Sequence, residues 1–402
     1  MLGREPSWRR ASVTTVTDEE FRLLVRDWLA KHLTGEFAGL RGAGGPGSEH
    51  EAFEERLAWD RQLHEAGWTP LSWPREHGGR GASLAQQLIF HEEYARAAAP
   101  ARVSHIGEQL LGPTMIEFGT AEQRRRFLPP IASVAELWCQ GFSEPGAGSD
   151  LASVSTSARL DGDHWEITGQ KVWTSLAHVA DWCFVLARTR AGSTRSAGLS
   201  LLLVPMRQPG ITVRPIRQLT GTSEFNEVFF DGARTDADLV LGDPGDGWRV
   251  ARFMLGVERG AAMFGQLIQF RRELDDVMAH ARRSGSATDP LVRDRIARAW
   301  VGLEVLRAYA LNSFSASQTG AEASVMKLLW ARWHKALGEL AMDVQGASGM
   351  VAKAAPYELE AWQRLYLFSR ADTIYGGSDE IQLGIIASRA LGLAPEPARG
   401  RR

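Results

Sequence analysis

The order of structural patterns along this chain of 402 residues restricts its fold more than any other feature. From about residue 18 to residue 128, apolar residues recur three and four positions apart, which is typical of amphipathic helices. Between about residues 137 and 240 the sequence changes to short β-rich runs separated by turn residues. Helical patterns return after Asp243 and continue to about Leu391. The sequence therefore predicts an α+β multidomain protein.

Breaker residues mark the borders between these regions. Pro129 and Pro130 close the first helical region, and Asp243-Pro244-Gly245 precedes the second. We expect an N-terminal all-α domain over residues 1–136, a middle β domain over 137–243 and a C-terminal α-helical domain over 244–402. The expected strands include 164–168, 182–188, 199–204 and 227–230, and the expected C-terminal helices are 248–281, 289–318, 323–344 and 378–391.

This order does not suit a nicotinamide-dependent dehydrogenase. Such an enzyme alternates strands and helices and carries a glycine-rich fingerprint directly after a strand. The segment PGAGSD at 145–150 is rich in glycine but lacks that context, so taken alone it is more simply a loop.

Composition also argues against several kinds of partner and location. A formal net charge of −2 gives no whole-chain reason to bind nucleic acid or an acidic membrane. Cys139 and Cys183 lie in apolar stretches without metal-ligand spacing, so we expect no metal site and a reducing compartment. No apolar run approaches the roughly 20 residues that cross a bilayer, and the N-terminus lacks the apolar centre of a secretory signal. We therefore expect a cytoplasmic protein without a membrane anchor.

Four segments are specific enough to indicate a family. They are FSEPGAGSD at 142–150, GQKVWTS at 169–175, VER at 257–259 and YGGSDEIQ at 375–382. With these motifs in this order, the chain resembles the acyl-CoA dehydrogenase family, and its bacterial members, over nearly its whole length. The resemblance implies a helical N-terminal domain, a central β-barrel-like domain and a C-terminal four-helix bundle, with FAD at their junction. It also implies an acyl-CoA substrate, an electron-transfer flavoprotein as acceptor and a tetramer.

The resemblance assigns roles to individual residues. Four consecutive residues would line the flavin and hydrogen-bond its pyrimidine side: Gln140, Gly141, Phe142 and Ser143. Trp173 would pack against the isoalloxazine, and Ser175 would place its hydroxyl near N5, where family members more often carry threonine. The other expected cofactor contacts are Ser149, Thr174, Ser378 and Glu380. The expected substrate contacts are Ser149, Trp248, Arg259 and Tyr375. Without the resemblance, Trp173 would be interpreted as an ordinary core aromatic.

The implied reaction requires a base that removes the α-proton of a thioester. A carboxylate in a nearly dry site gains basicity, hydrogen-bond donors stabilise the enolate oxygen, and the flavin takes the β-hydrogen as hydride. The family places this base at one of two positions. One is Gly376, which has no carboxylate, and the other is Glu258, immediately before Arg259. We expect Glu258 to be the base and the Gly376 N–H to donate to the thioester carbonyl, although Glu-Arg without that context is an exposed charged pair.

Two departures from the family pattern affect the inter-subunit half of the cofactor site. Many members carry Arg-x-x-Phe-Gly where this chain has a polar, turn-like segment at 282–290. A second cofactor loop is present as GASG at 346–349, with Asp343 at the position of a glutamine. This pattern is similar to bacterial members that assemble as α2β2 heterotetramers on steroid side chains or other bulky acyl-CoA substrates. The chain either pairs with a different subunit or holds the FAD adenine differently.

Three other functions remain compatible with this fold. An acyl-CoA oxidase would keep the base, whereas a flavin monooxygenase does not need it, so Glu258 argues against the latter. A non-catalytic subunit is favoured by the altered cofactor loops and opposed by the intact segments 143–150 and 171–175. The motifs do not define the acyl chain, or whether its carrier is CoA or a carrier protein.

Overall fold

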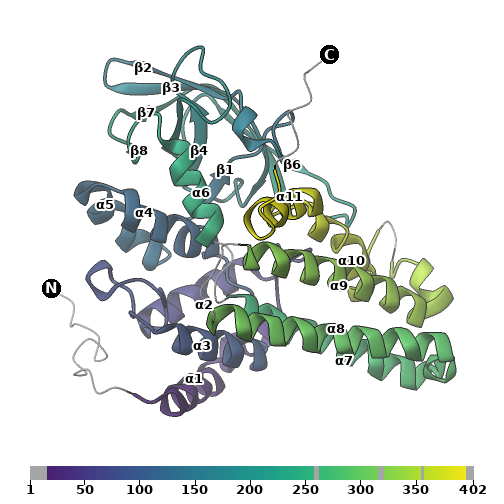
Figure 1. Cartoon of the computed structure of the whole chain (residues 1–402). Coiled ribbons are helices and arrows are strands. Elements are labelled where there is room, and N and C mark those ends of the chain that lie inside the picture. Colours follow the sequence, from purple (N-terminus) through teal and green to yellow (C-terminus); the bar gives the residue numbers. More distant parts are fainter. Residues whose placement is uncertain (1–15, 258–261, 316–320, 355–356, 395–402) are drawn as a thin grey trace, which may run out of the picture. The chain divides into compact units, whose positions relative to one another are not determined.

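The computed structural model describes residues 16–257, 262–315, 321–354 and 357–394 (Figure 1). The chain forms two compact units. The first contains residues 1–218 and 222–261, and the second contains residues 219–221 and 262–402. The helices of the first unit are α1 (Asp18–His32), α2 (Phe53–Glu65), α3 (Leu84–Arg96), α4 (Gly112–Phe118), α5 (Ala121–Ala132) and α6 (Gly247–Val257). Its strands are β1 (Trp138–Gly141), β2 (Ser157–Asp161), β3 (His164–Ser175), β4 (Trp182–Arg188), β5 (Leu199–Pro205), β6 (Ile211–Ile216), β7 (Phe225–Asp236) and β8 (Val240–Leu241).

The N-terminal helices begin at capping boxes and bury one apolar face. In α1 the Thr17 hydroxyl accepts a hydrogen bond from the Glu20 N–H, and the Glu20 carboxylate accepts one from the Thr17 N–H. Phe21, Val25 and Leu29 then recur every four residues and are all buried. The helical pattern predicted for the start of the chain is confirmed.

One predicted boundary is wrong. Pro129 and Pro130 do not close the helical region in front of them, because both lie in the last turn of α5, which extends to Ala132. A proline removes a donor, but its carbonyl can still accept. Pro129 O accepts from the Ser133 N–H at 3.0 Å and Pro130 O from the Ala135 N–H at 2.9 Å.

The strands form one mixed sheet of eight in the order β6-β7-β3-β2-β4-β5-β8, with β1 paired in parallel to β4. The predicted strands at 182–188 and 199–204 are confirmed as β4 and β5. The other two predicted strands lie inside β3 and β7, which are longer than expected. The sequence patterns did not predict β1, β2, β6 and β8. Among these, β6 and β2 are largely exposed edge or surface strands, and β6 contains Pro215.

The second unit is helical. Its helices are α7 (Ala262–Ser284), α8 (Pro290–Ser315), α9 (Glu322–Gln345), α10 (Ala361–Phe368) and α11 (Asp379–Arg389). Helices α7, α8 and α9 lie side by side (Figure 1) around buried side chains such as Leu274, Leu306 and Leu337. The expected polar turn begins later than predicted, because Arg282 and Arg283 belong to the last turn of α7, where positive charge stabilises a helix C-terminus.

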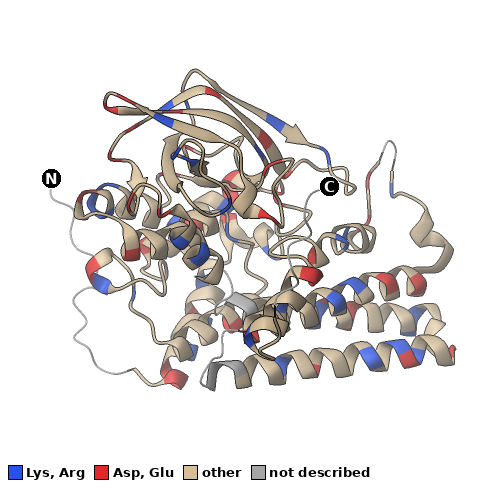
Figure 2. Cartoon of the chain, turned by 45° about the horizontal axis from the view of Figure 1, so that its top comes forward, with Lys and Arg blue, Asp and Glu red and all other residues tan. Residues whose placement is uncertain are grey.

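The architecture of N-terminal helices, a central sheet and C-terminal helices is thus confirmed. Acidic and basic residues are interspersed along the helices and the sheet (Figure 2). None of the helices within the described ranges is both long enough and apolar enough to span a membrane.

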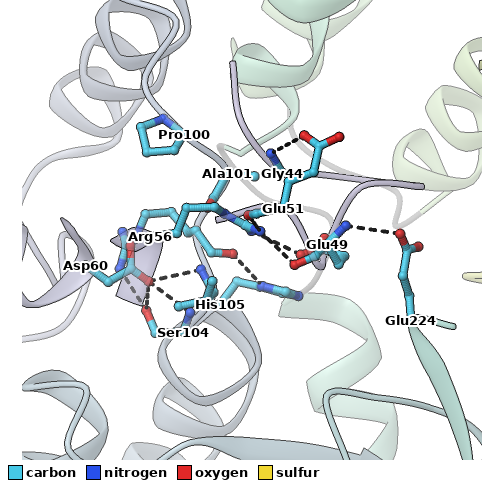
Figure 3. A network of polar contacts seen from close by, with 12 residues as sticks. Gly44, Glu49, Glu51, Arg56, Asp60, Pro100, Ala101, Ser104, His105 and Glu224 are labelled. Carbon is cyan, nitrogen blue, oxygen red and sulfur yellow. Dashed lines mark hydrogen bonds and ion pairs between the residues drawn. The ribbon is translucent and has the colours of Figure 1, made fainter. Parts of the chain in front are cut away.

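A buried network of charges in the first unit fixes the glycine-rich segment that precedes α2 (Figure 3). Arg56 is fully buried, and its guanidinium donates to the carbonyl oxygens of Glu49 and Ala101, both at 2.8 Å. Glu224, directly before β7, accepts from the N–H groups of Gly47 at 3.1 Å and Glu49 at 3.0 Å. Because these polar groups are all paired with each other, we assign the network a structural role.

Candidate active site

The structure brings two of the four sequence motifs together within the first unit. The Val172 N–H donates to the Ser143 carbonyl at 2.9 Å, which joins segment 169–175 to segment 142–150. The Lys171 ammonium lies beneath this junction and donates to the Phe142 carbonyl at 3.0 Å and to the Leu186 carbonyl at 2.7 Å. The end of β1 and the middle of β3 are therefore held in a defined relative position.

Lys171 also forms a buried ion pair with Glu144, at 2.8 Å between Nζ and Oε1. The Glu144 carboxylate accepts three further hydrogen bonds, from the N–H groups of Ser155 at 2.6 Å and Thr156 at 2.8 Å and from the Ser155 hydroxyl at 2.7 Å. Burial opposes the charged form, but Lys171 and these donors outweigh it and lower the pKa of Glu144 to about 2. Burial lowers the pKa of Lys171 to about 8 against the attraction of Glu144. The motifs contain both residues, but nothing in their spacing indicated that they pair.

Trp173 is not a core aromatic, contrary to what its residue type alone suggested. Its side chain is 57% exposed, and its φ is +61°, a backbone conformation that is rare for a bulky residue. The pairing of β3 with β7 shifts register between Lys171 and Thr174, so Trp173 stands at a bulge. Its ring meets Phe225 edge to face, with 6.1 Å between centroids. One face of a large aromatic ring is thus presented outward from a fixed strand.

The bulge is supported from β7 by Asn226, which is fully buried and lies opposite Thr174 in the ladder. The Asn226 amide donates to the Thr174 carbonyl at 3.0 Å and lies 3.3 Å from His178 Nδ1. The Thr174 hydroxyl is buried and has no hydrogen-bond partner among the described residues. Sequence reasoning did not single out Asn226.

These features fit a flat aromatic cofactor. The exposed Trp173 ring offers a stacking surface, and the backbone of segment 140–143 runs beside Lys171. At Gly141 an added Cβ would lie only 3.0 Å from Cys183 Sγ, so a side chain there would require its neighbours to shift by a few tenths of an ångström. Gln140 and Ser143 are partly exposed, and Ser149 is exposed in the following loop. The expected flavin-contacting residues of the first unit thus include accessible polar groups.

The expected substrate contacts of the first unit are only partly described. Trp248 lies in α6 and packs, partly buried, against the core. The predicted base Glu258 and its neighbour Arg259 lie outside the described residues.

In the second unit, the YGGS motif forms a turn that two glycines make possible. Gly376 has φ +64° and Gly377 has φ +92°, conformations that favour glycine. The Gln382 amide donates to the carbonyl oxygens of Gly376 at 3.1 Å and Gly377 at 3.2 Å. Ser378 caps α11, and Glu380 is exposed in its first turn.

Beside this turn lies a polar cluster that sequence reasoning missed. Asp372 accepts from the Tyr375 hydroxyl at 2.7 Å and from His334 Nδ1 at 2.6 Å, and His334 Nε2 lies 3.0 Å from Glu273 Oε2. Burial alone would lower the pKa of His334, but the two carboxylates raise it to about 9. The Lys327 ammonium donates to the Asp372 carbonyl and lies 4.5 Å from the centre of the Tyr375 ring.

Asp343 and the GASG segment at 346–349, which depart from the family pattern, both lie in helical structure. Asp343, in the last turns of α9, forms an ion pair with Arg295 of α8. The GASG segment begins a short 3-10 helix, Gly346–Met350.

Comparison with known proteins agrees with the geometry. The chain matches models of the acyl-CoA dehydrogenase N-terminal domain (residues 15–135), middle domain (residues 139–233) and C-terminal domain (residues 245–391). It is 63% identical over 384 residues to acyl-CoA dehydrogenase IpdE1 of Mycobacterium tuberculosis, covering 95% of this chain and 99% of that protein. It is 60% identical over 388 residues to IpdE1 of Mycolicibacterium smegmatis, covering 94% and 98%.

Solved structures of similar fold include the Tcur3481-Tcur3483 steroid ACAD, with 28% identity, a TM-score of 0.81 and coverage of 98% of this chain and 99% of that one. The ChsE4-ChsE5 complex from Mycobacterium tuberculosis is similar at 28% identity and a TM-score of 0.77, covering 96% and 100%. Family models and curated relatives that span nearly the whole chain show that it belongs to the acyl-CoA dehydrogenases, a family of FAD-dependent oxidoreductases.

Proposed function

We propose that this enzyme converts an acyl-CoA thioester to the trans-2-enoyl-CoA, with Glu258 as the base that removes the α-proton. When bound, FAD supplies the acceptor for the β-hydrogen, which leaves as hydride toward N5. The observation that carries this proposal is the backbone of position 376, the alternative base position of the family. It is a glycine with φ +64°, so it supplies neither a carboxylate nor a conformation suited to one.

The proposed role of Gly376 is to hold the substrate. Its N–H has no hydrogen-bond acceptor among the described residues, while its carbonyl is occupied by Gln382. A backbone N–H directed at the thioester oxygen stabilises the negative charge that develops there as the α-proton leaves. Tyr375, Ser149, Trp248 and Arg259 are the further proposed substrate contacts.

The proposed cofactor contacts follow the motifs. Gln140, Gly141, Phe142 and Ser143 would hydrogen-bond the pyrimidine side of the flavin, and Trp173 would stack on its ring. Thr174 and Ser175 would lie near N5, with Ser149, Ser378 and Glu380 completing the set. The support is the exposed Trp173 ring and the hydrogen-bonded junction between segments 142–150 and 169–175.

We also propose that the enzyme works as an assembly of subunits and transfers its electrons to an electron-transfer flavoprotein. Helix α8 carries a row of exposed apolar side chains that includes Val301, Val305 and Leu311, while Leu303 and Leu306 on its other face fill the core. A second apolar face on one helix is typical of an interface. Two structural neighbours are named as pairs of chains, and one of them is named a steroid ACAD, which supports a heteromer and a bulky acyl group.

We also propose the domain boundaries at 136/137 and 243/244.

The decisive experiment on function is a panel of acyl-CoA thioesters with an artificial electron acceptor, run on wild type and Glu258→Gln. The substitution keeps size and removes basicity, so we expect kcat to fall at least about a thousandfold, roughly 4 kcal/mol of barrier, with FAD retained. Glu65→Gln, at the exposed end of α2, is the matched control and should change nothing. Turnover by Glu258→Gln within tenfold of wild type would exclude Glu258 as the base.

The competing functions are separated by two simple observations. A dehydrogenase whose flavin has been reduced by substrate reoxidises slowly in oxygen while product is bound, whereas an oxidase reoxidises rapidly. A non-catalytic subunit would bind acyl-CoA without bleaching of the flavin absorption.

A further inference from the structure

The turn that carries Gly376 is held by a chain of hydrogen bonds that reaches back through two helices. Asp372 is only 1% exposed, and each of its carboxylate oxygens has a separate partner. Oδ1 accepts from the Tyr375 hydroxyl at 2.7 Å, and Oδ2 accepts from His334 Nδ1 at 2.6 Å. Asp372 thus connects α9, which contributes His334, to the residue directly before Gly376.

His334 extends this chain to α7. Its Nε2 lies 3.0 Å from Glu273 Oε2, so a carboxylate lies at each ring nitrogen and both nitrogens donate. The ring also stacks on Phe270, with 4.5 Å between centroids. A buried imidazolium held between two carboxylates and an aromatic face has little freedom to rotate.

The turn is fixed from the other side as well. The Gln382 amide is fully buried and donates to the carbonyl oxygens of Gly376 and Gly377. The Lys327 ammonium donates to the Asp372 main-chain carbonyl at 2.5 Å. These contacts act on the main-chain atoms of the turn on both sides of the Tyr375–Gly376 peptide, so the direction of the Gly376 N–H depends on them.

We propose that Asp372 is a positioning residue for catalysis, which aims the Gly376 N–H at the thioester carbonyl by connecting the Tyr375 hydroxyl to His334. This rests on the proposed function of Gly376. Asp372 itself would touch neither substrate nor cofactor. A donor that is misdirected by a small rotation of the peptide loses much of its stabilisation of the developing oxyanion, while substrate binding through the rest of the molecule is kept. The expected signature is therefore a loss in kcat with little change in KM.

His334 offers a matched pair of variants for the test. Asp372→Asn and Glu273→Gln make the same chemical change, carboxylate to amide, on opposite sides of the same imidazole. Of these two carboxylates, it is Asp372 that accepts a hydrogen bond from the Tyr375 hydroxyl in the turn. Tyr375→Phe removes the hydroxyl that donates to Asp372 and changes a side chain that is 40% exposed, so it keeps the test available where Asp372→Asn fails to fold.

Two readouts are measured on the FAD-loaded enzyme. The first is kcat and KM with the best thioester of the panel. The second is the long-wavelength charge-transfer absorption produced when a 3-thiaacyl-CoA, which is not oxidised, binds as its α-carbanion beside the flavin. This band requires polarisation of the thioester carbonyl, so a merely structural role for Asp372 would not move it at equal FAD content.

We expect Asp372→Asn and Tyr375→Phe to lower kcat about tenfold or more and to weaken the band, with KM within about threefold of wild type, while Glu273→Gln stays within about twofold. Equal effects of Asp372→Asn and Glu273→Gln, or a Tyr375→Phe enzyme that matches wild type in both readouts, would overturn the proposal. Failure of the proposed function gives a different result, because it appears without any change at Asp372 or Tyr375: either wild type itself shows neither turnover nor the band, or Glu258→Gln keeps both.

Discussion

Lys171 and Glu144 form an ion pair inside the first unit, with 2.8 Å between Nζ and Oε1 and with both side chains buried. The pair connects the two motifs that the family resemblance assigns to the flavin, since Lys171 lies in β3 and Glu144 in the glycine-rich segment. The main role of the pair is to hold these two motifs in position. Replacing two buried charges together often costs little stability, whereas removing one of them is strongly destabilising.

The first prediction concerns this pair. Lys171→Met leaves the Glu144 carboxylate buried without its counter-charge and should destabilise the first unit by about 3–5 kcal/mol. Lys171→Met with Glu144→Gln should recover part of that loss and should still bind FAD poorly, because Lys171 also holds the Phe142 carbonyl. Thermal melting, with flavin content measured from the ratio of visible to ultraviolet absorption, checks both statements. A Lys171→Met variant that is as stable as wild type would contradict them.

The second prediction uses Trp173, whose φ of +61° suits glycine better than tryptophan. Trp173→Gly should leave the apoprotein at least as stable as wild type, because the exposed side chain contributes little to the core and the strain is relieved. It should raise the Kd for FAD about fivefold, since loss of an aromatic stacking contact costs on the order of 1 kcal/mol. Trp173→Phe is the control and should keep most of the affinity. Unchanged FAD affinity in Trp173→Gly would remove Trp173 from the cofactor site.

The third prediction is the effect of pH on the second unit. The folded-state pKa of His334 is about 9, above the 6.5 of an unperturbed histidine, because Asp372 and Glu273 favour the protonated ring. The contribution of His334 protonation to the free energy of unfolding is therefore fully present below about pH 6.5. It is lost as pH rises through about 9, and the loss is at most about 3 kcal/mol. Melting of wild type and His334→Gln between pH 6 and pH 9.5 measures this. The difference in melting temperature between wild type and His334→Gln should become smaller at high pH. A difference that does not change with pH would contradict the prediction.

The fourth prediction is that the base cannot simply be moved to position 376. In the Glu258→Gln background, Gly376→Glu should not restore turnover. Its backbone would be strained at φ +64°, and an added Cβ would begin 3.9 Å from the Lys327 ammonium, whose positive charge lowers the basicity of a carboxylate. Gly376→Ala in the same background separates backbone strain from the added carboxylate. Recovery of kcat to within about tenfold of wild type would show that position 376 still accepts the base.

The fifth prediction concerns assembly through α8. Val301→Glu combined with Val305→Glu should reduce the molar mass measured by light scattering, because two charges placed in an apolar interface lose their hydration. Val301→Ala combined with Val305→Ala keeps the face apolar and should retain the assembly. An unchanged mass for the glutamate variant would show that this face of α8 is not an interface.

Local sequence patterns predicted some elements well and others poorly, for a physical reason. The continuous apolar runs of β4 and β5 predicted their strands to within about one residue, because strands covered on both faces must be apolar throughout. In contrast, β6 carries alternating exposed residues and Pro215, and its place at the sheet edge comes from pairing with β7, which its own sequence does not specify.

The same division applies to the site. By itself the sequence determined the family, the order of helical and β regions, the candidate base Glu258 and the absence of a carboxylate at Gly376, since these depend on residue identity at motif positions. Only the tertiary structure decided that Lys171 pairs with Glu144, 27 residues away, and that Asp372 meets His334 at a separation of 38 residues. Periodicity records which face of an element is buried, but the partner of a buried charge depends on which distant segment the fold places within hydrogen-bond distance of it.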